Sequence, residues 1–352
     1  MFRRCLHALI FIGLTSLLPA SAPSYAQTTV PAAPPPKSDP AVGTPRRTFT
    51  TNLVETAPTP HERWDSLTLE GSGLELHSAI LGEKDEFPDF TRELWRVEWR
   101  DGDPIDLYVI RPIATRKTPV ILFLYGYPAS TDRFRNDAYC RSVTKGGVAA
   151  VGFVSALTGP RYHDRPWKEW FVGNLQESLV TSVHDVQMVL NYLATRDDLD
   201  MQHVGMFGQG SGGTIALLAS AVDPRLKAVD VLDPWGDWPE WFKQSSLIAE
   251  QERAQYLTPA FQAGIANLDP LRWLPRDTRG PLRLQSTAFD RITPELAKSS
   301  IERALPPGAE HVTYDSVANY QERAAAGGQV LSWLRNQLAP QGPVGIQPQA
   351  GR

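Results

Sequence analysis

The chain has 352 residues, of which 42% are hydrophobic and 21% charged, and its formal net charge is −4 at pH 7. This composition is typical of a soluble globular protein, and the length suffices for one large α/β domain or two ordinary ones. Charges of both signs alternate along the chain, so the sequence predicts no basic surface of the kind that binds nucleic acid.

The first 26 residues have the pattern of a targeting segment. Arg3 and Arg4 precede an apolar run at residues 6–18, and residues 24–26 place small side chains at positions −3 and −1 of a cleavage site. The run is shorter than the roughly 20 apolar residues that span a bilayer. We therefore predict a signal peptide cut after Ala26, a periplasmic or secreted protein, and no stable membrane insertion after cleavage. A retained N-terminal anchor is the alternative.

Three further segments follow from composition. Residues 27–47 are rich in Pro, Ala, Ser and Thr and predict an extended linker. Residues 48–338 form the predicted domain, and residues 339–352 a flexible tail. After signal cleavage Cys140 is the one remaining cysteine, which excludes an intramolecular disulfide.

Strand and helix patterns alternate through the predicted domain. Residues 94–99 and 105–110 alternate with period two around the turn at residues 101–103, which predicts an antiparallel hairpin. Further strands are predicted at residues 120–124, 148–154, 204–207, 226–232, 282–287 and 311–314, with helices at residues 173–194 and 321–338. This order predicts the α/β class: a mostly parallel central sheet with helices on both faces and an N-terminal antiparallel hairpin.

Residues 204–216 combine an apolar strand, four glycines within six positions, and the start of a buried helix at Thr214. A strand that reverses sharply into a helix at such a cluster is the plan of a nucleophile elbow, which holds a catalytic side chain above a sheet. With Gly208 two positions before the apex and Gly212 two positions after it, the apex is Gly210. Glycine has no nucleophile.

The order of elements, the turn at residues 208–213 and two loops resemble the α/β-hydrolase superfamily, in particular its secreted esterase and prolyl-oligopeptidase-like branches. The resemblance covers residues 90–338 and implies an α/β-hydrolase fold. It implies that the Leu-Tyr-Gly-Tyr-Pro stretch, with Tyr125, Gly126 and Tyr127, forms the oxyanion loop.

The same resemblance implies that the triad is degenerate. Asp290 matches the position of the acid, but Gly210 stands at the nucleophile position and Asn319 at the histidine position. A carboxamide cannot serve as a general base near neutral pH. We therefore predict an exported, non-catalytic protein that binds a small or peptide-like ligand.

Ser211 offers an alternative nucleophile. In that register Gln209 would lie two positions before the nucleophile, where the turn needs a very small residue. In active relatives the residue after the apex supplies a backbone N–H to the oxyanion hole, and its side chain need not react. The alternative is an active esterase-like or peptidase-like serine hydrolase that uses Ser211, Asp290 and His163.

Among the histidines, only His163 follows a core strand on the side where sites in such sheets lie. His203 and His311 begin strands, and His184 lies within a helix. A polar and aromatic pocket is predicted from Tyr125, Gly126, Tyr127, His163, Asp233 and Trp235.

Three tryptophans near the predicted pocket allow two interpretations. Trp235, Trp238 and Trp241 could form an aromatic wall or lid, or could simply pack an extra helix into the core. No cluster of His, Asp and Glu has the spacing of a metal site, so neither a metal nor a cofactor is predicted.

Overall fold

The computed structural model describes residues 62–129, 131–157, 172–274, 280–325 and 329–339. Contacts divide the chain into two units, Met1–Glu55 and Thr56–Arg352, and every described residue belongs to the second. The predicted signal peptide and linker, and all but the first residue of the predicted tail, lie outside the described residues. Within the described ranges, no helix has the length and apolar character that a membrane span requires.

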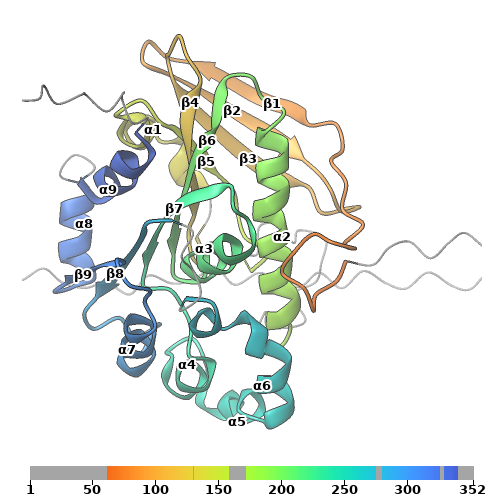
Figure 1. Ribbon diagram of the computed structural model, residues 1–352, viewed down its shortest axis with the longest axis vertical. Coiled ribbons are helices and arrows are strands. Elements are labelled where there is room, and N and C mark those ends of the chain that lie inside the picture. Colours follow the sequence, from red (N-terminus) through yellow and green to blue (C-terminus); the bar gives the residue numbers. More distant parts are fainter. Residues whose placement is uncertain (1–61, 130, 158–171, 275–279, 326–328, 340–352) are drawn as a thin grey trace, which may run out of the picture. The chain divides into compact units, whose positions relative to one another are not determined.

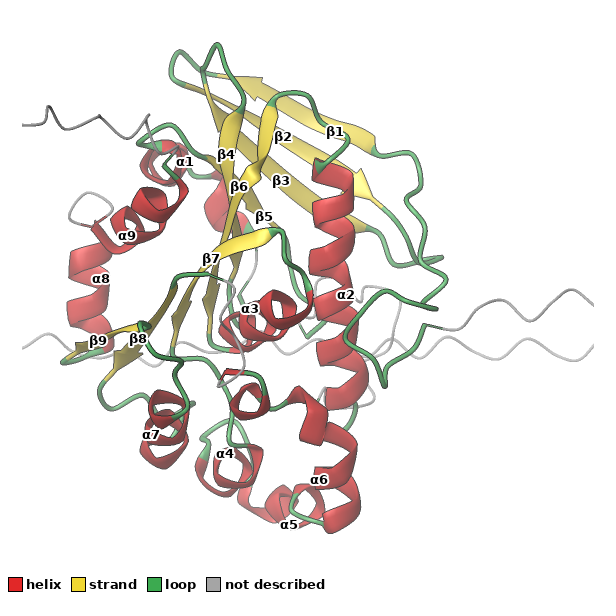
Figure 2. Cartoon of the chain, viewed as in Figure 1, coloured by secondary structure: helices red, strands yellow, loops and turns green. Residues whose placement is uncertain are grey.

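The core is a nine-stranded sheet with the strand order β1-β2-β3-β5-β4-β6-β7-β8-β9 (Figures 1 and 2). The strands are β1 Ile80–Glu86, β2 Phe90–Val97, β3 Ile105–Pro112, β4 Thr118–Leu124, β5 Ala149–Gly152, β6 Leu199–Gln209, β7 Leu226–Leu232, β8 Leu282–Thr287 and β9 Glu310–Tyr314. From β5 to β9 all neighbours are parallel, whereas β1, β2 and β3 pair antiparallel and β3 joins β5 antiparallel. The predicted fold class, with its N-terminal hairpin, is confirmed.

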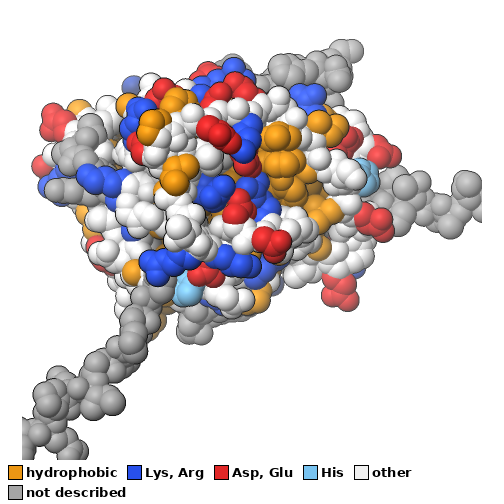
Figure 3. Space-filling view, turned by 90° about the horizontal axis from the view of Figure 1, so that it is seen from above, with side chains coloured by type: hydrophobic (Ala, Val, Ile, Leu, Met, Phe, Trp, Pro, Cys, Tyr) orange, Lys and Arg blue, Asp and Glu red, His pale blue; other side chains and the backbone are white. Residues whose placement is uncertain are grey.

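Strand β1 was not predicted. Its sequence, Ile-Leu-Gly-Glu-Lys-Asp-Glu, lacks a period-two apolar pattern because the strand lies at the sheet edge and is exposed along almost its whole length. Its register with β2 shifts between Leu81 and Glu83, which marks a β-bulge or a similar irregularity. Figure 3 shows charged side chains of both signs interspersed with apolar ones on one face of the molecule.

Helices cover both faces of the sheet, as Figure 2 shows. Strand β4 is buried on both sides: Val120, Leu122 and Leu124 belong to one apolar cluster, and Ile121 and Phe123 to the other. The first cluster includes helices α2 Leu175–Leu193 and α3 Ser211–Val222, and the second includes α1 Asp137–Thr144 and α9 Gln329–Leu338. Each large apolar side chain buried this way contributes roughly 1.5–3 kcal/mol, so the two clusters fix the sheet between the helices.

The C-terminal part differs from its prediction. In place of one helix over residues 321–338, the structure has α8 Val317–Ala325 and α9 Gln329–Leu338. The sequence between them contains Gly327 and Gly328, and glycine is among the residues least favourable to helix interiors. Helix α8 also begins before Asn319, so Asn319 lies in the first turn of this helix.

The segment between β7 and β8 forms short helices: α4 Trp238–Gln244, α5 Arg253–Tyr256 and α6 Pro259–Ile265. Trp235, Trp238 and Trp241 are at most 1% exposed, and the ring centroids of Trp235 and Trp241 lie 4.9 Å apart. The core-packing interpretation of the three tryptophans is therefore correct, and the aromatic wall or lid is not formed. Helix α7, Glu295–Arg303, follows β8.

A buried ion cluster, formed by Glu62, Arg100, Asp185 and His184, ties α2 to the segment before the sheet. Arg100 donates to Asp185 and, at 2.6 Å from Nη2 to Oε1, to Glu62. His184 Nδ1 lies 2.6 Å from Glu62 Oε1, and His184 Nε2 lies 3.0 Å from the Ser66 carbonyl oxygen. Asp185 also accepts a hydrogen bond from the Trp99 indole at 2.9 Å. Both ring nitrogens of His184 are therefore engaged inside the fold.

Candidate functional site

The elbow joins β6 to α3 at Gly210, which has φ 54° and ψ −124°. Its flanking glycines are required by close backbone contacts. A Cβ on Gly212 would lie 2.0 Å from the Leu124 carbonyl oxygen, and one on Gly208 would lie 2.3 Å from the Gly212 carbonyl oxygen. The positive φ at Gly210 is a backbone conformation that residues other than glycine rarely adopt. The glycine at this position therefore suits the sharp turn.

The apex at Gly210 lies between the loop after β4 and the Trp235 indole. A Cβ on Gly210 would stand 3.5 Å from Trp235 Nε1 and 3.7 Å from Gly126 Cα, which are ordinary contact distances. The Gly210 N–H donates to the Leu232 carbonyl oxygen at 2.8 Å. The apex therefore has room for a small side chain, but this chain places none there.

Ser211 is the first residue of α3 and is 0% exposed. Its Oγ accepts a hydrogen bond from the Tyr127 N–H at 2.9 Å. In this type of site, N–H groups of the loop and of the residue after the apex bind the oxyanion. Here the serine hydroxyl itself occupies the Tyr127 N–H, and no general base among the described residues is hydrogen-bonded to Ser211.

Asp290 lies in the turn after β8 and stabilises that turn. Its carboxylate accepts from the Ile292 N–H at 2.9 Å and from the Thr293 N–H at 3.1 Å. Asn319 donates its own backbone N–H to Ser316 Oγ at 3.1 Å. Within the described residues no hydrogen bond joins Asp290 to Ser211 or Asn319, and His163 lies outside those residues.

Asp233 follows β7 with a φ of 45° and is 8% exposed. Its carboxylate accepts from the Thr287 N–H at 2.9 Å and the Thr287 hydroxyl at 2.7 Å, and Lys298 Nζ lies 3.5 Å from Oδ1. Burial raises the pKa of Asp233, against the opposing effects of Lys298 and Thr287. This acid is held in place by its neighbours at the carboxyl end of the sheet.

A cavity of about 560 Å³, here called the strand-end cavity, lies beside the elbow where β4, β6, β7 and β8 end. Its main polar side chains are Tyr125, Arg133, Tyr139, Gln209, Asp233 and Tyr320. Of the predicted pocket residues, Tyr125 and Asp233 line this cavity, whereas Trp235 belongs to the buried core. Trp235 is thus a core side chain packed behind the apex and not an exposed pocket side chain.

The sequence did not identify Arg133, Tyr139 and Tyr320 as site residues. They lie on the short helix η1 Asp132–Arg135, on α1 and on α8. No motif marks them, because only the packing of these helices over the strand ends brings them together.

Three phenols give the strand-end cavity its chemistry. The hydroxyls of Tyr125 and Tyr139 lie 2.6 Å apart, and the guanidinium carbon of Arg133 lies 3.4 Å from the centroid of the Tyr125 ring. Burial raises the pKa of Tyr125, Tyr139 and Tyr320. All three phenols therefore remain protonated hydrogen-bonding groups at neutral pH.

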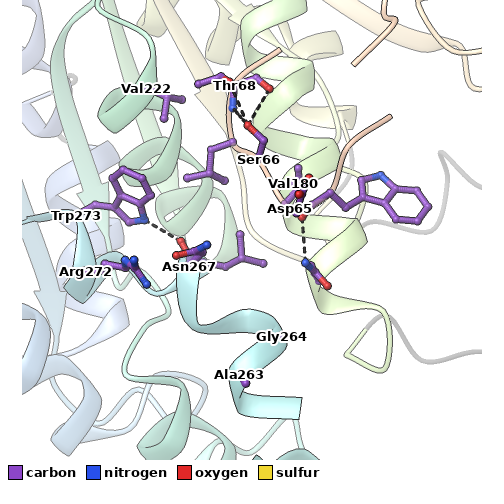
Figure 4. Close-up of a pocket in the computed structure, with 14 residues that line it drawn as sticks. Asp65, Ser66, Thr68, Val180, Val222, Ala263, Gly264, Asn267, Arg272 and Trp273 are labelled. Carbon is purple, nitrogen blue, oxygen red and sulfur yellow. Dashed lines mark hydrogen bonds between the residues drawn. The ribbon is translucent and has the colours of Figure 1, made fainter. Parts of the chain in front are cut away.

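A second cavity, of about 500 Å³, lies at the other end of α3, where Val222 is the last helical residue (Figure 4). The Trp273 indole N–H there donates to the Asn267 carbonyl oxygen at 2.8 Å. None of the predicted site residues lines this cavity. Among the described residues, no group of three or more His, Cys, Asp or Glu side chains could hold a metal ion.

Part of the chain matches a model of a known family. The family model for X-Pro dipeptidyl-peptidase (S15 family) matches residues 101–264, which include the elbow. No curated protein sequence matches this chain.

Solved structures with the same fold include several hydrolases. An acetyl xylan esterase from Paenibacillus sp. R4 superposes with a TM-score of 0.58 at 16% identity, covering 78% of this chain and 93% of the esterase. An S-formylglutathione hydrolase from Agrobacterium tumefaciens gives 0.56 at 15% identity, covering 73% and 99%. An acylaminoacyl peptidase from Pyrococcus horikoshii gives 0.57 at 14% identity, covering 73% of this chain and 43% of that one. At these identities the likeness is one of fold.

Proposed function

This chain has the fold of the α/β-hydrolase superfamily, and from that premise we propose that it is an exported, non-hydrolytic member that binds a small ligand in the strand-end cavity. One observation carries the proposal. The elbow apex is Gly210, and the adjacent Ser211 hydroxyl is buried and bonded to the Tyr127 N–H.

Hydrolysis in this fold needs a nucleophile at the apex and a base that takes its proton. Gly210 supplies no side chain, and Ser211 has no base hydrogen-bonded to it among the described residues. Both carboxylate oxygens of Asp290 accept hydrogen bonds from the turn that follows it. Ser211 and Asp290 are thus each engaged in structural hydrogen bonds.

The strand-end cavity supports a binding role. Small-molecule sites have volumes of roughly 300–1,000 Å³ and combine apolar walls with a few polar groups, and this cavity measures about 560 Å³. Its phenols, guanidinium and amide come from both the strand ends and the covering helices. Export is supported by the charged, apolar and small-residue pattern of residues 1–26.

Active-site labelling tests the proposal. Protein expressed from the full chain, whose mature N-terminus should be Gln27, is incubated with a fluorophosphonate probe and with 4-nitrophenyl acetate and butyrate. We expect neither labelling nor turnover above buffer. Gly210→Ser should remain inactive, because the side chain fits but the described residues place no general base beside the apex.

Two controls separate the alternatives. Stoichiometric labelling that disappears in Ser211→Ala would refute the proposal and favour a serine hydrolase. If the wild type hydrolyses the esters, loss of this hydrolysis in His163→Ala would identify His163 as the general base. Substantial activity in Gly210→Ser alone would equally contradict the account, because it would mean that a base is present.

A further inference from the structure

We infer that the strand-end cavity recognises the carboxylate of a small organic monoanion with an aromatic or aliphatic body, and that Arg133 is the group that binds this carboxylate. The inference rests on the proposed ligand-binding function and names the class of its ligand. It follows from the charge, the donors and the walls of the cavity, taken in turn.

Arg133 differs from three other buried or part-buried arginines near the sheet. Arg92, Arg196 and Arg283 each form a salt bridge with an aspartate or glutamate. The described residues supply no salt bridge to Arg133, whose guanidinium instead stacks on the Tyr125 ring at 3.4 Å. The guanidinium also interacts with the Tyr125 hydroxyl. Because a guanidinium has five N–H donors, others remain for a planar, bidentate partner such as a carboxylate.

The phenols supply further donors next to this cation. In the Tyr125–Tyr139 pair, whose oxygens lie 2.6 Å apart, one hydroxyl donates to the other, so the accepting hydroxyl keeps its own proton for another partner. Burial raises the pKa of Tyr320, so its hydroxyl also remains a donor. A carboxylate can accept about four hydrogen bonds, which a guanidinium and two phenols can largely provide.

Charge limits the ligand to a monoanion. Asp233 lines the same cavity, and Lys298 and Thr287 already hold its carboxylate. A dianion such as a phosphate monoester would bring two negative charges to one guanidinium with Asp233 nearby. A carboxylate matches the single positive charge of Arg133 and suffers less of that repulsion.

The walls indicate the body of the ligand. Phe207, Leu232, Val143 and Leu331 line the cavity between the sheet and the covering helices. The volume of about 560 Å³ leaves room for an aromatic or aliphatic group beyond the carboxylate. A fully polar ligand would leave these apolar walls without complementary contacts.

The experiment compares acids with their neutral amides. Isothermal titration calorimetry of the mature protein uses benzoate, phenylacetate and 4-hydroxycinnamate, each paired with its primary amide. We expect at least one acid to bind with a Kd below about 1 mM and at least tenfold more tightly than its amide. Arg133→Gln should weaken that acid at least tenfold and leave its amide unchanged.

Matched variants and one further anion complete the design. Arg135→Gln removes an arginine of the same short helix, whose guanidinium bonds to the Tyr108 hydroxyl at 2.7 Å instead, and should bind like wild type. Arg133→Lys keeps the charge and should bind the acid more tightly than Arg133→Gln. Phenyl phosphate should bind more weakly than the acid. Circular dichroism confirms that each variant is folded.

The inference is overturned if none of the three acids shows saturable binding, if acid and amide bind equally, or if Arg133→Gln binds the acid like wild type. Tighter binding of phenyl phosphate would also overturn it. These results are independent of the labelling test. A positive fluorophosphonate reaction contradicts the non-hydrolytic proposal without affecting the role of Arg133, and loss of acid recognition leaves the absence of hydrolysis intact.

Discussion

Triad catalysis requires a sharp backbone turn and a histidine–carboxylate pair in one place. In this protein the elbow has the turn, and the buried ion cluster has the pair. The elbow has the sharp backbone turn, with φ 54° at Gly210, but no reactive side chain at its apex. The ion cluster has a histidine 2.6 Å from a carboxylate, which is the chemistry of a catalytic pair, but it is enclosed within the fold.

The difference lies in what the second nitrogen of the histidine contacts. His184 Nε2 lies 3.0 Å from the Ser66 carbonyl oxygen, where an active triad would present a nucleophile. His184 is 0% exposed, so no substrate can reach it. The comparison teaches that neither the residue types nor the backbone geometry identifies a reaction unless both meet at an accessible point.

The largest expected effect concerns the elbow. Gly212→Ala would place a Cβ 2.0 Å from the Leu124 carbonyl oxygen and 2.7 Å from its carbonyl carbon, and backbone on both sides leaves little freedom to relax. We expect a loss of more than about 4 kcal/mol in the free energy of unfolding, measured by urea denaturation followed by circular dichroism.

Gly210→Ala is the matched control for this prediction. It meets ordinary contacts and carries only the strain of its positive φ, about 1–3 kcal/mol. Equal stability losses in the two variants would show that packing against β4 does not hold the elbow.

The second effect concerns the ion cluster. Asp185→Ala removes the acceptor of both the Trp99 indole and Arg100 in the interior, and breaking a buried ion pair costs roughly 3–5 kcal/mol. Thermal and urea unfolding measure this loss. Asp65→Ala breaks the exposed pair with Arg63 and should leave the transition unchanged. If Asp185→Ala is equally harmless, the cluster does not anchor α2.

The smallest effect is a pH dependence. Burial opposes ionisation of Glu62, but hydrogen bonds from Arg100 and His184 prevail and lower the pKa of Glu62 below its usual 4.5. The unfolded chain then binds this proton first, so the stability contribution is present above about pH 4.5 and is lost as the pH falls through the folded value.

Glu62→Gln cannot titrate and tests this dependence. We expect the free energy of unfolding of the variant to fall less steeply with acidification below pH 4.5 than that of the wild type. The measurement is urea denaturation at several pH values. Parallel slopes would exclude Glu62 as a source of acid sensitivity.

The sequence predicted the fold well where burial imposes a clear pattern. Strands β4 and β7 are largely apolar runs, and their predicted bounds agree with the structure within two residues. Strand β1 was not predicted, because an exposed edge strand needs no apolar alternation. The division into α8 and α9 was missed because the apolar spacing continues across Gly327 and Gly328.

The candidate site was less predictable for a physical reason. The elbow is local, so its glycines can be read from consecutive residues. The strand-end cavity instead brings Tyr320 of α8 together with Tyr125 and Arg133, which come much earlier in the chain, and no spacing rule links them. The role of the Ser211 hydroxyl also depends on a partner more than 80 residues away.

Strand β1 has one more consequence. Among the described residues no strand pairs with its outer edge, and Ile80 and Leu81 are exposed at its start. An open apolar edge invites edge-to-edge aggregation with another molecule. The four residues 83–86 are all charged, and the register shift between Leu81 and Glu83 interrupts regular pairing. Charges and an irregular register at a sheet edge are features that oppose edge-to-edge pairing between molecules.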